Sequence, residues 1–79
     1  MKEARKRLRV DPFIKKLGGR IRTIRKQKEM TLEQLAAQCD LEYVQLSRIE
    51  RGLINTSVSH IYVIAEGLGV TCKHIFDFK

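Results

Sequence analysis

Two cysteines and two histidines could bind a metal ion, because thiolate and imidazole groups are the usual protein ligands of zinc. They are Cys39, His60, Cys72 and His74. Structural zinc sites take their ligands in pairs such as Cys-x2–4-Cys, and the Cys72-x-His74 spacing does not match that pattern. Cys39 stands among apolar residues, where a thiol packs as a small hydrophobic side chain. We therefore expect no metal site and no cofactor, and two thiols indicate no disulfide framework.

Enzyme active sites need other groups, and the sequence does not offer them in a recognisable arrangement. There is no Gly-rich phosphate loop after a strand, no cluster of carboxylates and no nucleophile set. A chain of 79 residues buries roughly 60% of the surface that its unfolded form exposes. Such a domain has little room for a pocket, a lid and a catalytic shell, so we do not expect an enzyme.

Composition favours an ordinary folded domain. Hydrophobic residues make up 43% and charged residues 32% of the chain, which is not the composition of a disordered protein. No apolar run approaches the ~20 residues of a membrane-spanning helix, and no apolar segment follows the basic N-terminus as it would in a signal peptide. We expect a cytoplasmic protein that does not enter a membrane.

Positive charge is concentrated in the first third of the chain. The net charge of +7 divides into +4 for residues 1–10, +6 for residues 11–28 and −3 for residues 29–79. A surface of this kind attracts a polyanion such as DNA by counterion release. Basic runs are also common on faces that only meet water, so charge alone leaves both interpretations open.

Residues 1–10 are predicted to form a flexible basic arm, and residues 11–79 the folded domain. The arm is almost entirely charged and has no apolar period that could bury a face. Its cations either follow a nucleic-acid backbone or minor groove, or they only solubilise the chain; they are Arg5, Lys6, Arg7 and Arg9. Deleting residues 2–9 would separate the two interpretations by the salt dependence of DNA binding.

Local signals predict five short helices. The residues that mark helix starts and stops are Asp11-Pro12, Thr31 with Gln34, Gly52, Thr56 or Ser57, and Gly69. Asp11 is predicted to cap the first helix and Pro12 suits its first helical position, Thr with Gln three residues later is a capping box, and Gly favours a helix end. The third helix is predicted over residues 42–51 and the fifth around 72–76.

Apolar residues recur every three or four positions in these segments, as in helices with one buried face. These residues are Phe13, Leu17, Ile21, Ile24, Leu32, Leu35, Ala36, Cys39, Leu46, Ile49, Val58, Ile61, Ile64, Ala65, Leu68, Ile75 and Phe76. Gly18 and Gly19 weaken the first helix, which suggests close packing there. With no strand pattern or internal repeat, the fold class is predicted to be all-α.

The second and third helices meet across a turn at residues 38–41. A small side chain at Ala36 permits close approach of the helices, and Asp40 tolerates the left-handed backbone expected in the turn. Leu46 and Ile49 face inward from the later helix. This arrangement sets two helices at a steep angle and leaves one face of the later helix exposed.

Four segments resemble the Cro/repressor (XRE-type) helix-turn-helix family. They are Arg20-Ile-Arg-Thr-Ile-Arg25, Thr31-Leu-Glu-Gln-Leu-Ala36, Leu46-Ser-Arg-Ile-Glu-Arg-Gly52 and Ile64-Ala-Glu-Gly-Leu-Gly-Val70. The resemblance covers about residues 17–76. It implies a five-helix, lambda-repressor-like domain that binds double-stranded DNA sequence-specifically as a homodimer and regulates transcription, as a repressor.

In this family the third helix reads base edges in the major groove. The resemblance assigns base contacts to Tyr43, Val44, Gln45 and Arg48. Gln pairs with adenine, Arg with guanine, and Val contacts a thymine methyl group, while a Tyr hydroxyl donates to a base or phosphate.

Other positions are implied to meet the DNA backbone or to hold the fold. The expected phosphate contacts are Ser47, Arg51, Arg22 and Lys26. The resemblance also implies a partly buried ion pair between Arg25 and Glu50. Loss of one partner of such a pair harms folding when the other stays buried.

The sequence departs from the family pattern at four positions. Leu32 replaces a Gln whose side chain contacts DNA, so one expected contact is missing. Glu29 stands where Gly is common and is strained if its backbone is left-handed. Glu42 caps a helix less well than the usual Ser or Thr, and Thr56 replaces the usual Pro.

Two questions stay open at this stage. The same fold also serves antitoxins and adaptors that bind proteins, and competition between specific and random DNA distinguishes these functions. A homodimer could use a patch on the fourth and fifth helices, with Phe76 and Phe78 near its edge. The same two aromatic rings could instead close the core of the monomer.

Overall fold

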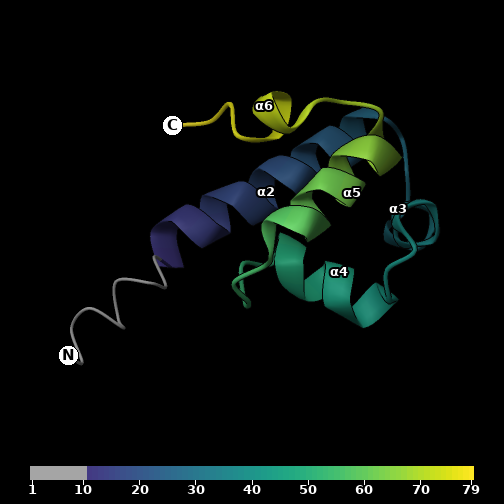
Figure 1. Cartoon of the computed structure of the whole chain (residues 1–79), viewed down its shortest axis with the longest axis horizontal. Helices are drawn as coiled ribbons and strands as arrows, with labels where there is room; N and C mark the ends of the chain where they lie inside the picture. Colours follow the sequence, from purple (N-terminus) through teal and green to yellow (C-terminus); the bar gives the residue numbers. More distant parts are fainter. Residues whose placement is uncertain (1–10) are drawn as a thin grey trace.

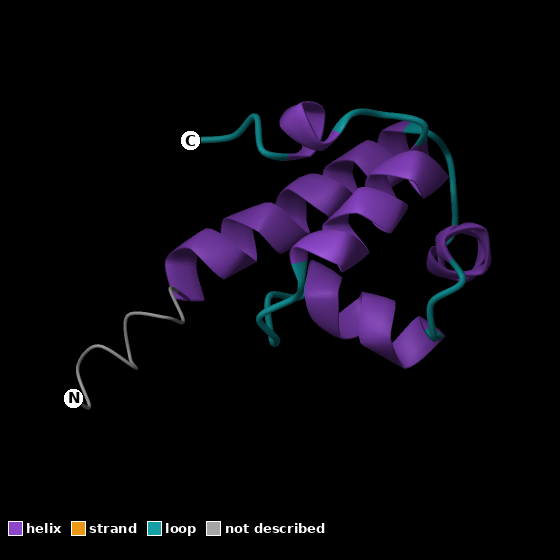
Figure 2. Ribbon diagram, in the orientation of Figure 1, coloured by secondary structure: helices purple, strands orange, loops and turns teal. Residues whose placement is uncertain are grey.

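Five helices follow one another through residues 11–79, the part of the chain that the computed structural model describes (Figure 1; Figure 2). They are α2 (Asp11–Gln27), α3 (Leu32–Cys39), α4 (Tyr43–Glu50), α5 (Val58–Leu68) and α6 (Cys72–Ile75). The described residues include no strand, and the all-α prediction is confirmed. The predicted arm at residues 1–10 lies outside the described residues. None of the described helices is long and apolar enough to cross a lipid bilayer.

Packing between the helices closes a ring around one core. Helix α2 contacts α4, α4 contacts α3, α3 contacts α5, α5 contacts α6, and α6 returns to α2. The largest fully buried side chains come from every member of this ring and are Ile21, Ile24, Leu35, Leu46, Ile49, Ile64 and Ile75. Each helix therefore buries one apolar face, as the sequence period predicted.

Three residues of the predicted apolar stripes, Phe13, Val58 and Phe76, lie outside the core. Val58 is 84% exposed because it occupies the first turn of α5, at the rim of an apolar cleft. Phe13 is 46% exposed and packs against the rings of Phe76 and Phe78, with centroid distances of 6.4 and 5.3 Å. Phe78 is half-buried against the core, whereas Phe76 is exposed. The Phe78 ring thus helps to close the core, whereas the Phe76 ring stays on the surface.

Capping follows the predicted pattern at α3 and α5. At α3 the Gln34 amide donates to the Thr31 hydroxyl, and the Gln34 side chain accepts from the Thr31 amide. Ser57, rather than Thr56, caps α5, and Gly69 ends it in a left-handed conformation. Helix α4 covers Tyr43–Glu50, one residue shorter at each end than predicted, because Glu42 occupies the N-cap position with no side-chain hydrogen bond. Asp11, expected as a cap, is already helical.

Close contact between α2 and α4 depends on a missing side chain. A Cβ atom at Gly18 would collide with the carbonyl oxygen of Ile49 and would lie 2.6 Å from that of Glu50. A Cβ atom at Gly19 would meet nothing within 4 Å. The predicted close packing is therefore present at Gly18 and absent at Gly19, and it holds α2 against the end of α4.

Candidate nucleic-acid interface

Helix α4 is anchored by one side and free on the other. Leu46 and Ile49 are almost fully buried, whereas Tyr43 and Val44 are 50% and 54% exposed. In Figure 1, α4 lies along the lower edge of the molecule, and one side of it faces no other helix. An exposed face on a firmly anchored helix suits recognition of an extended surface such as a groove of DNA.

The turn between α3 and α4 fixes the angle of α4. Asp40 has φ 55°, in the left-handed region, and its amide donates to the carbonyl oxygens of Ala36 and Ala37. The Leu41 amide donates to the Ala36 oxygen at 2.9 Å. These bonds pair carbonyls that a helix end leaves open. The small side chain of Ala36 is buried, as expected at a close crossing.

Three of the four predicted base-contacting residues surround one hollow. Val44, Gln45 and Arg48 line it together with Glu42 and Ile54, and its volume is about 430 Å³. Apolar, amide and guanidinium groups are therefore presented side by side. This is the mixture of contacts that reads base edges.

Tyr43 lies outside this hollow and belongs to the next face of α4. It precedes Ser47 by four residues and therefore lies on the same side of the helix. Tyr43 is exposed on α4 as predicted but does not line this hollow, and its base contact stays a prediction.

A second hollow collects most of the predicted phosphate contacts. Its lining residues are Arg22, Arg25, Leu32, Ser47, Glu50 and Arg51. Arg22 and Arg51 are exposed, Ser47 is half-buried, and the Arg51 Nε atom donates to the Ser47 carbonyl oxygen at 3.4 Å. Lys26 is exposed on α2 but does not line this hollow. Guanidinium and hydroxyl donors converging from α2 and α4 are suited to a phosphate.

Arg25 and Glu50 form a buried, two-point ion pair between α2 and α4. The Arg25 Nε and Nη2 atoms donate to the two Glu50 carboxylate oxygens at 2.7 and 3.0 Å. The Nη1 atom donates to the Met30 carbonyl oxygen at 2.8 Å. The hydrogen bond to Glu50 raises the pKa of Arg25 above its ordinary value, although burial acts in the opposite direction. The positive charge of Arg25 thus offsets the negative charge of the Glu50 carboxylate and reduces its repulsion of DNA.

His60 is the residue at this interface that the sequence analysis did not associate with DNA. Its ring lies beside Gln45, with 3.4 Å between the Nε2 atoms of the two side chains. The sequence analysis considered His60 only as a zinc ligand, in a site that it did not expect. No signal in the sequence predicted this contact, because it joins two helices across a loop.

The residues considered for zinc do not come together. Among residues 11–79 no three His, Cys, Asp or Glu side chains are placed to hold a metal ion. Burial raises the pKa of the Cys39 thiol, which disfavours the thiolate that zinc needs. His74 faces a cation, because the Arg20 Nη2 atom lies 3.3 Å from its Nε2 atom and 3.0 Å from its carbonyl oxygen.

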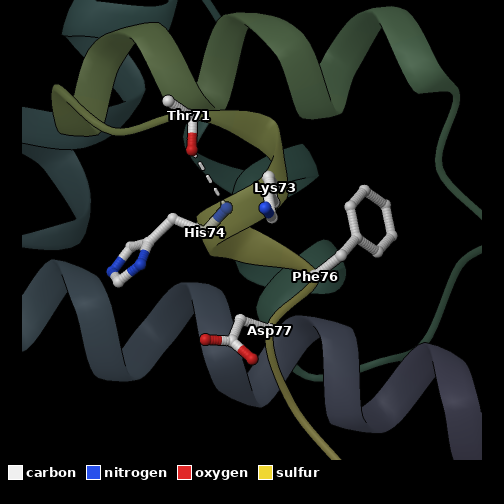
Figure 3. A pocket seen from close by; sticks show the side chains of 5 residues that line it. All are labelled: Thr71, Lys73, His74, Phe76 and Asp77. Atoms are coloured by element: carbon white, nitrogen blue, oxygen red, sulfur yellow. Dashed lines mark hydrogen bonds between the residues drawn. The ribbon is translucent and has the colours of Figure 1, made fainter.

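A shallow hollow surrounds α6 on another side of the molecule. Figure 3 shows its lining residues, with His74 and Phe76 projecting to opposite sides of α6 and the Thr71 hydroxyl bonded to the His74 amide. Asp77 places a carboxylate in the same hollow. The hollow is open and has mixed charge, so it lacks the cationic character of the surface around α4.

Comparison with known proteins gives one consistent result. A protein-family model described as helix-turn-helix matches residues 21–75. Control protein C.BamHI of Bacillus amyloliquefaciens is 44% identical over 62 residues, which are 77% of this chain and 76% of that protein. The restriction-modification controller protein C.AhdI from Aeromonas hydrophila superposes with a TM-score of 0.78 at 30% identity, covering 80% of this chain and 96% of that one.

A further solved structure includes nucleic acid. The restriction-modification controller protein C.Esp1396I, a tetramer in complex with its natural 35 base-pair operator, has a TM-score of 0.77 to this chain at 32% identity. The similarity covers 82% of this chain and 86% of that one. All these matches include the α3–α4 region within residues 21–75.

Proposed function

This chain belongs to the helix-turn-helix family of DNA-binding transcriptional regulators, and we propose that it represses transcription by inserting α4 into the major groove of an operator. One observation carries the proposal. Leu46 and Ile49 fix α4 from its buried side, while Val44, Gln45 and Arg48 surround one hollow on its exposed side. Binding, rather than catalysis, is the activity we assign to this domain, acting on DNA in the cytoplasm.

Each of the three side chains has a matching base. The Gln45 amide nitrogen donates to the N7 atom of adenine while its oxygen accepts from the N6 amino group, Arg48 donates to the O6 and N7 atoms of guanine, and Val44 contacts a thymine methyl group. A well-formed bidentate contact discriminates between bases by about 1–3 kcal/mol. We assign Tyr43 to the edge of this contact, toward the backbone, because it lies outside the hollow.

Backbone phosphates are assigned to the second hollow. Arg22 and Arg51 bring positive charge from α2 and α4, and the Ser47 hydroxyl adds a neutral donor. Lys26 extends the cationic surface along α2. These contacts set affinity and orientation, whereas base contacts set sequence preference.

A homodimer explains how so short a helix selects an operator. Eight residues of α4 span about 12 Å, enough for only a few base pairs. Two copies on half-sites about one turn (~34 Å) apart multiply the specificity. The exposed side chains of Phe13, Val58 and Phe76 line one apolar cleft, and we assign this patch to the dimer contact.

The targets we propose are genes of a restriction-modification system. The support comes from the control protein C.BamHI and from the two solved controller proteins, which share 30% identity or more with this chain over most of its length. Repression by occupancy is the proposed mode, because a bound dimer covers the DNA beneath it.

Selection of bound sequences from a random DNA pool, at fixed salt, tests the proposal. We expect an enriched motif with two-fold symmetry and half-sites about one turn (~34 Å) apart. Gln45→Ala should change the preference at one base pair of each half-site, whereas Lys73→Ala on α6 should leave the motif unchanged. A specificity ratio near one against random DNA would overturn the proposal and favour a protein-binding adaptor or antitoxin.

A further inference from the structure

His60 lies between the proposed reading helix and the loop that follows it. It is the third residue of α5, and its amide donates to the Ser57 hydroxyl at 3.1 Å. Its half-buried ring touches two polar side chains. The Nε2 atom lies 3.4 Å from the Gln45 Nε2 atom, and the Nδ1 atom lies 3.4 Å from the Thr56 Oγ1 atom.

The chemistry of these groups orders the protons of the cluster. An amide nitrogen only donates, so the His60 Nε2 atom must accept the hydrogen bond from Gln45. A neutral imidazole then carries its proton on Nδ1, where it donates to the Thr56 hydroxyl oxygen. Every polar atom of the ring has a partner in this arrangement, so the ring is held from both sides.

We propose that His60 is a positioning residue for base readout, which holds the Gln45 amide in the one orientation that matches its base pair. The inference rests on the proposed function of Gln45 as a base contact. His60 itself need not touch DNA. It acts by keeping the Gln45 amide nitrogen partly turned inward, so that the amide oxygen and the remaining N–H group face outward.

Orientation matters because a glutamine amide is asymmetric. Adenine offers the acceptor N7 and the donor N6 in the major groove, and a matching amide must present its donor and acceptor in the corresponding order. Rotation of the amide by half a turn exchanges the two and favours another pattern of base edges. A long, flexible glutamine also loses much rotamer freedom when it is fixed, and a contact that fixes it before binding reduces that cost.

Two substitutions separate positioning from folding. In His60→Gln, the terminal amide reaches about as far as the ring Nε2 atom and can accept from Gln45. In His60→Asn, the amide ends near the former Nδ1 position and reaches Thr56 but not Gln45. Both variants keep a polar side chain at the same position of α5, so similar melting temperatures are expected.

Sequence selection measures the effect. His60→Asn should lower the preference at the base pair read by Gln45 by roughly three- to tenfold, with unchanged preference elsewhere and unchanged affinity for random DNA. His60→Gln should restore the wild-type preference to within about twofold. In a Gln45→Ala background, His60→Asn should have no further effect. An identical motif for wild type and His60→Asn, or an equal loss at all positions, would overturn the inference.

A second measurement does not involve DNA. Nitrogen-15 NMR of the free protein should show the His60 ring protonated at Nδ1 and unprotonated at Nε2, with a restrained Gln45 amide that becomes mobile in His60→Asn. The opposite tautomer, or an amide equally mobile in both proteins, contradicts the positioning role. If the wild-type protein enriches no DNA sequence, the proposed function fails instead, and this NMR result still decides whether His60 holds Gln45.

Discussion

Three nitrogen atoms of the Arg25 guanidinium all donate to oxygen atoms inside the protein. Two bonds go to the Glu50 carboxylate and one to the Met30 carbonyl. A charge in such a place is expensive to desolvate, and only its partners make it tolerable. The pair joins α2 to the end of α4. It therefore fixes the position of α4, the helix that we propose reads the bases.

Arg25→Ala should therefore damage folding more than base preference. The substitution leaves the Glu50 carboxylate buried without its partner, at a cost of about 3–5 kcal/mol in the free energy of unfolding. Urea denaturation measures this loss. Arg22→Ala is the matched control, since Arg22 is exposed, and it should change stability by less than ~0.5 kcal/mol. Equal stabilities for wild type and Arg25→Ala would contradict the structural role.

At this scale the sequence predicted residue identities better than directions. The resemblance predicted the pair of Arg25 and Glu50, which the structure contains, but not which exposed residues of α4 share a hollow. The side on which a residue at the start of a short helix lies depends on the rotation of that helix, which its packing fixes. The contact between His60 and Gln45 was unpredictable for the same reason, since it joins two helices across a loop.

Helix α2 has no side chain at the point where α4 crosses it, because Gly18 occupies that position. Gly18 brings the two backbones together, and the next residue, Gly19, faces open space. Periodicity indicated where the helices are, and capping signals placed α3 and α5 well. The end of α4 and the exposure of Val58 were not predictable, because they depend on which neighbouring element covers each helix end.

The two adjacent glycines give a matched test of the crossing. Gly18→Ala should destabilise the protein by about 1–3 kcal/mol, because the added methyl group meets carbonyl oxygens of α4 that cannot move freely. Gly19→Ala should be neutral or stabilising by up to about 1 kcal/mol, because alanine favours the helix and the methyl group meets nothing. Thermal melts of both variants compare them directly. A stable Gly18→Ala protein would show that α4 can shift.

The whole molecule has an uneven charge that follows its proposed contact with DNA. Residues 11–28 carry a net charge of +6 and residues 29–79 carry −3, yet α2 packs on α4. Two cations of α2, Arg22 and Arg25, therefore lie beside α4, although they are far from it in sequence. The sequence alone shows the uneven charge, whereas the fold brings these cations next to α4.

Salt dependence reports these contacts. Arg51→Ala should reduce the slope of log K against log salt concentration by about one, because one phosphate contact is lost. Its effect on base preference should be small. Lys73→Ala removes the same charge from α6 and should leave the slope unchanged. A slope that falls equally in both variants would indicate a general effect of net charge.

The tight crossing at Gly18, reinforced by the Arg25–Glu50 pair, has a consequence for the duplex itself. Helix α2, to which we assign phosphate contacts, and α4, to which we assign base contacts, are joined without a hinge, so the protein sets the distance between the two kinds of contact. A stiff double helix must adapt to that spacing, and some base steps bend or twist far more easily than others. We expect operators of this protein to favour compliant steps, such as pyrimidine–purine steps, at positions that no side chain touches.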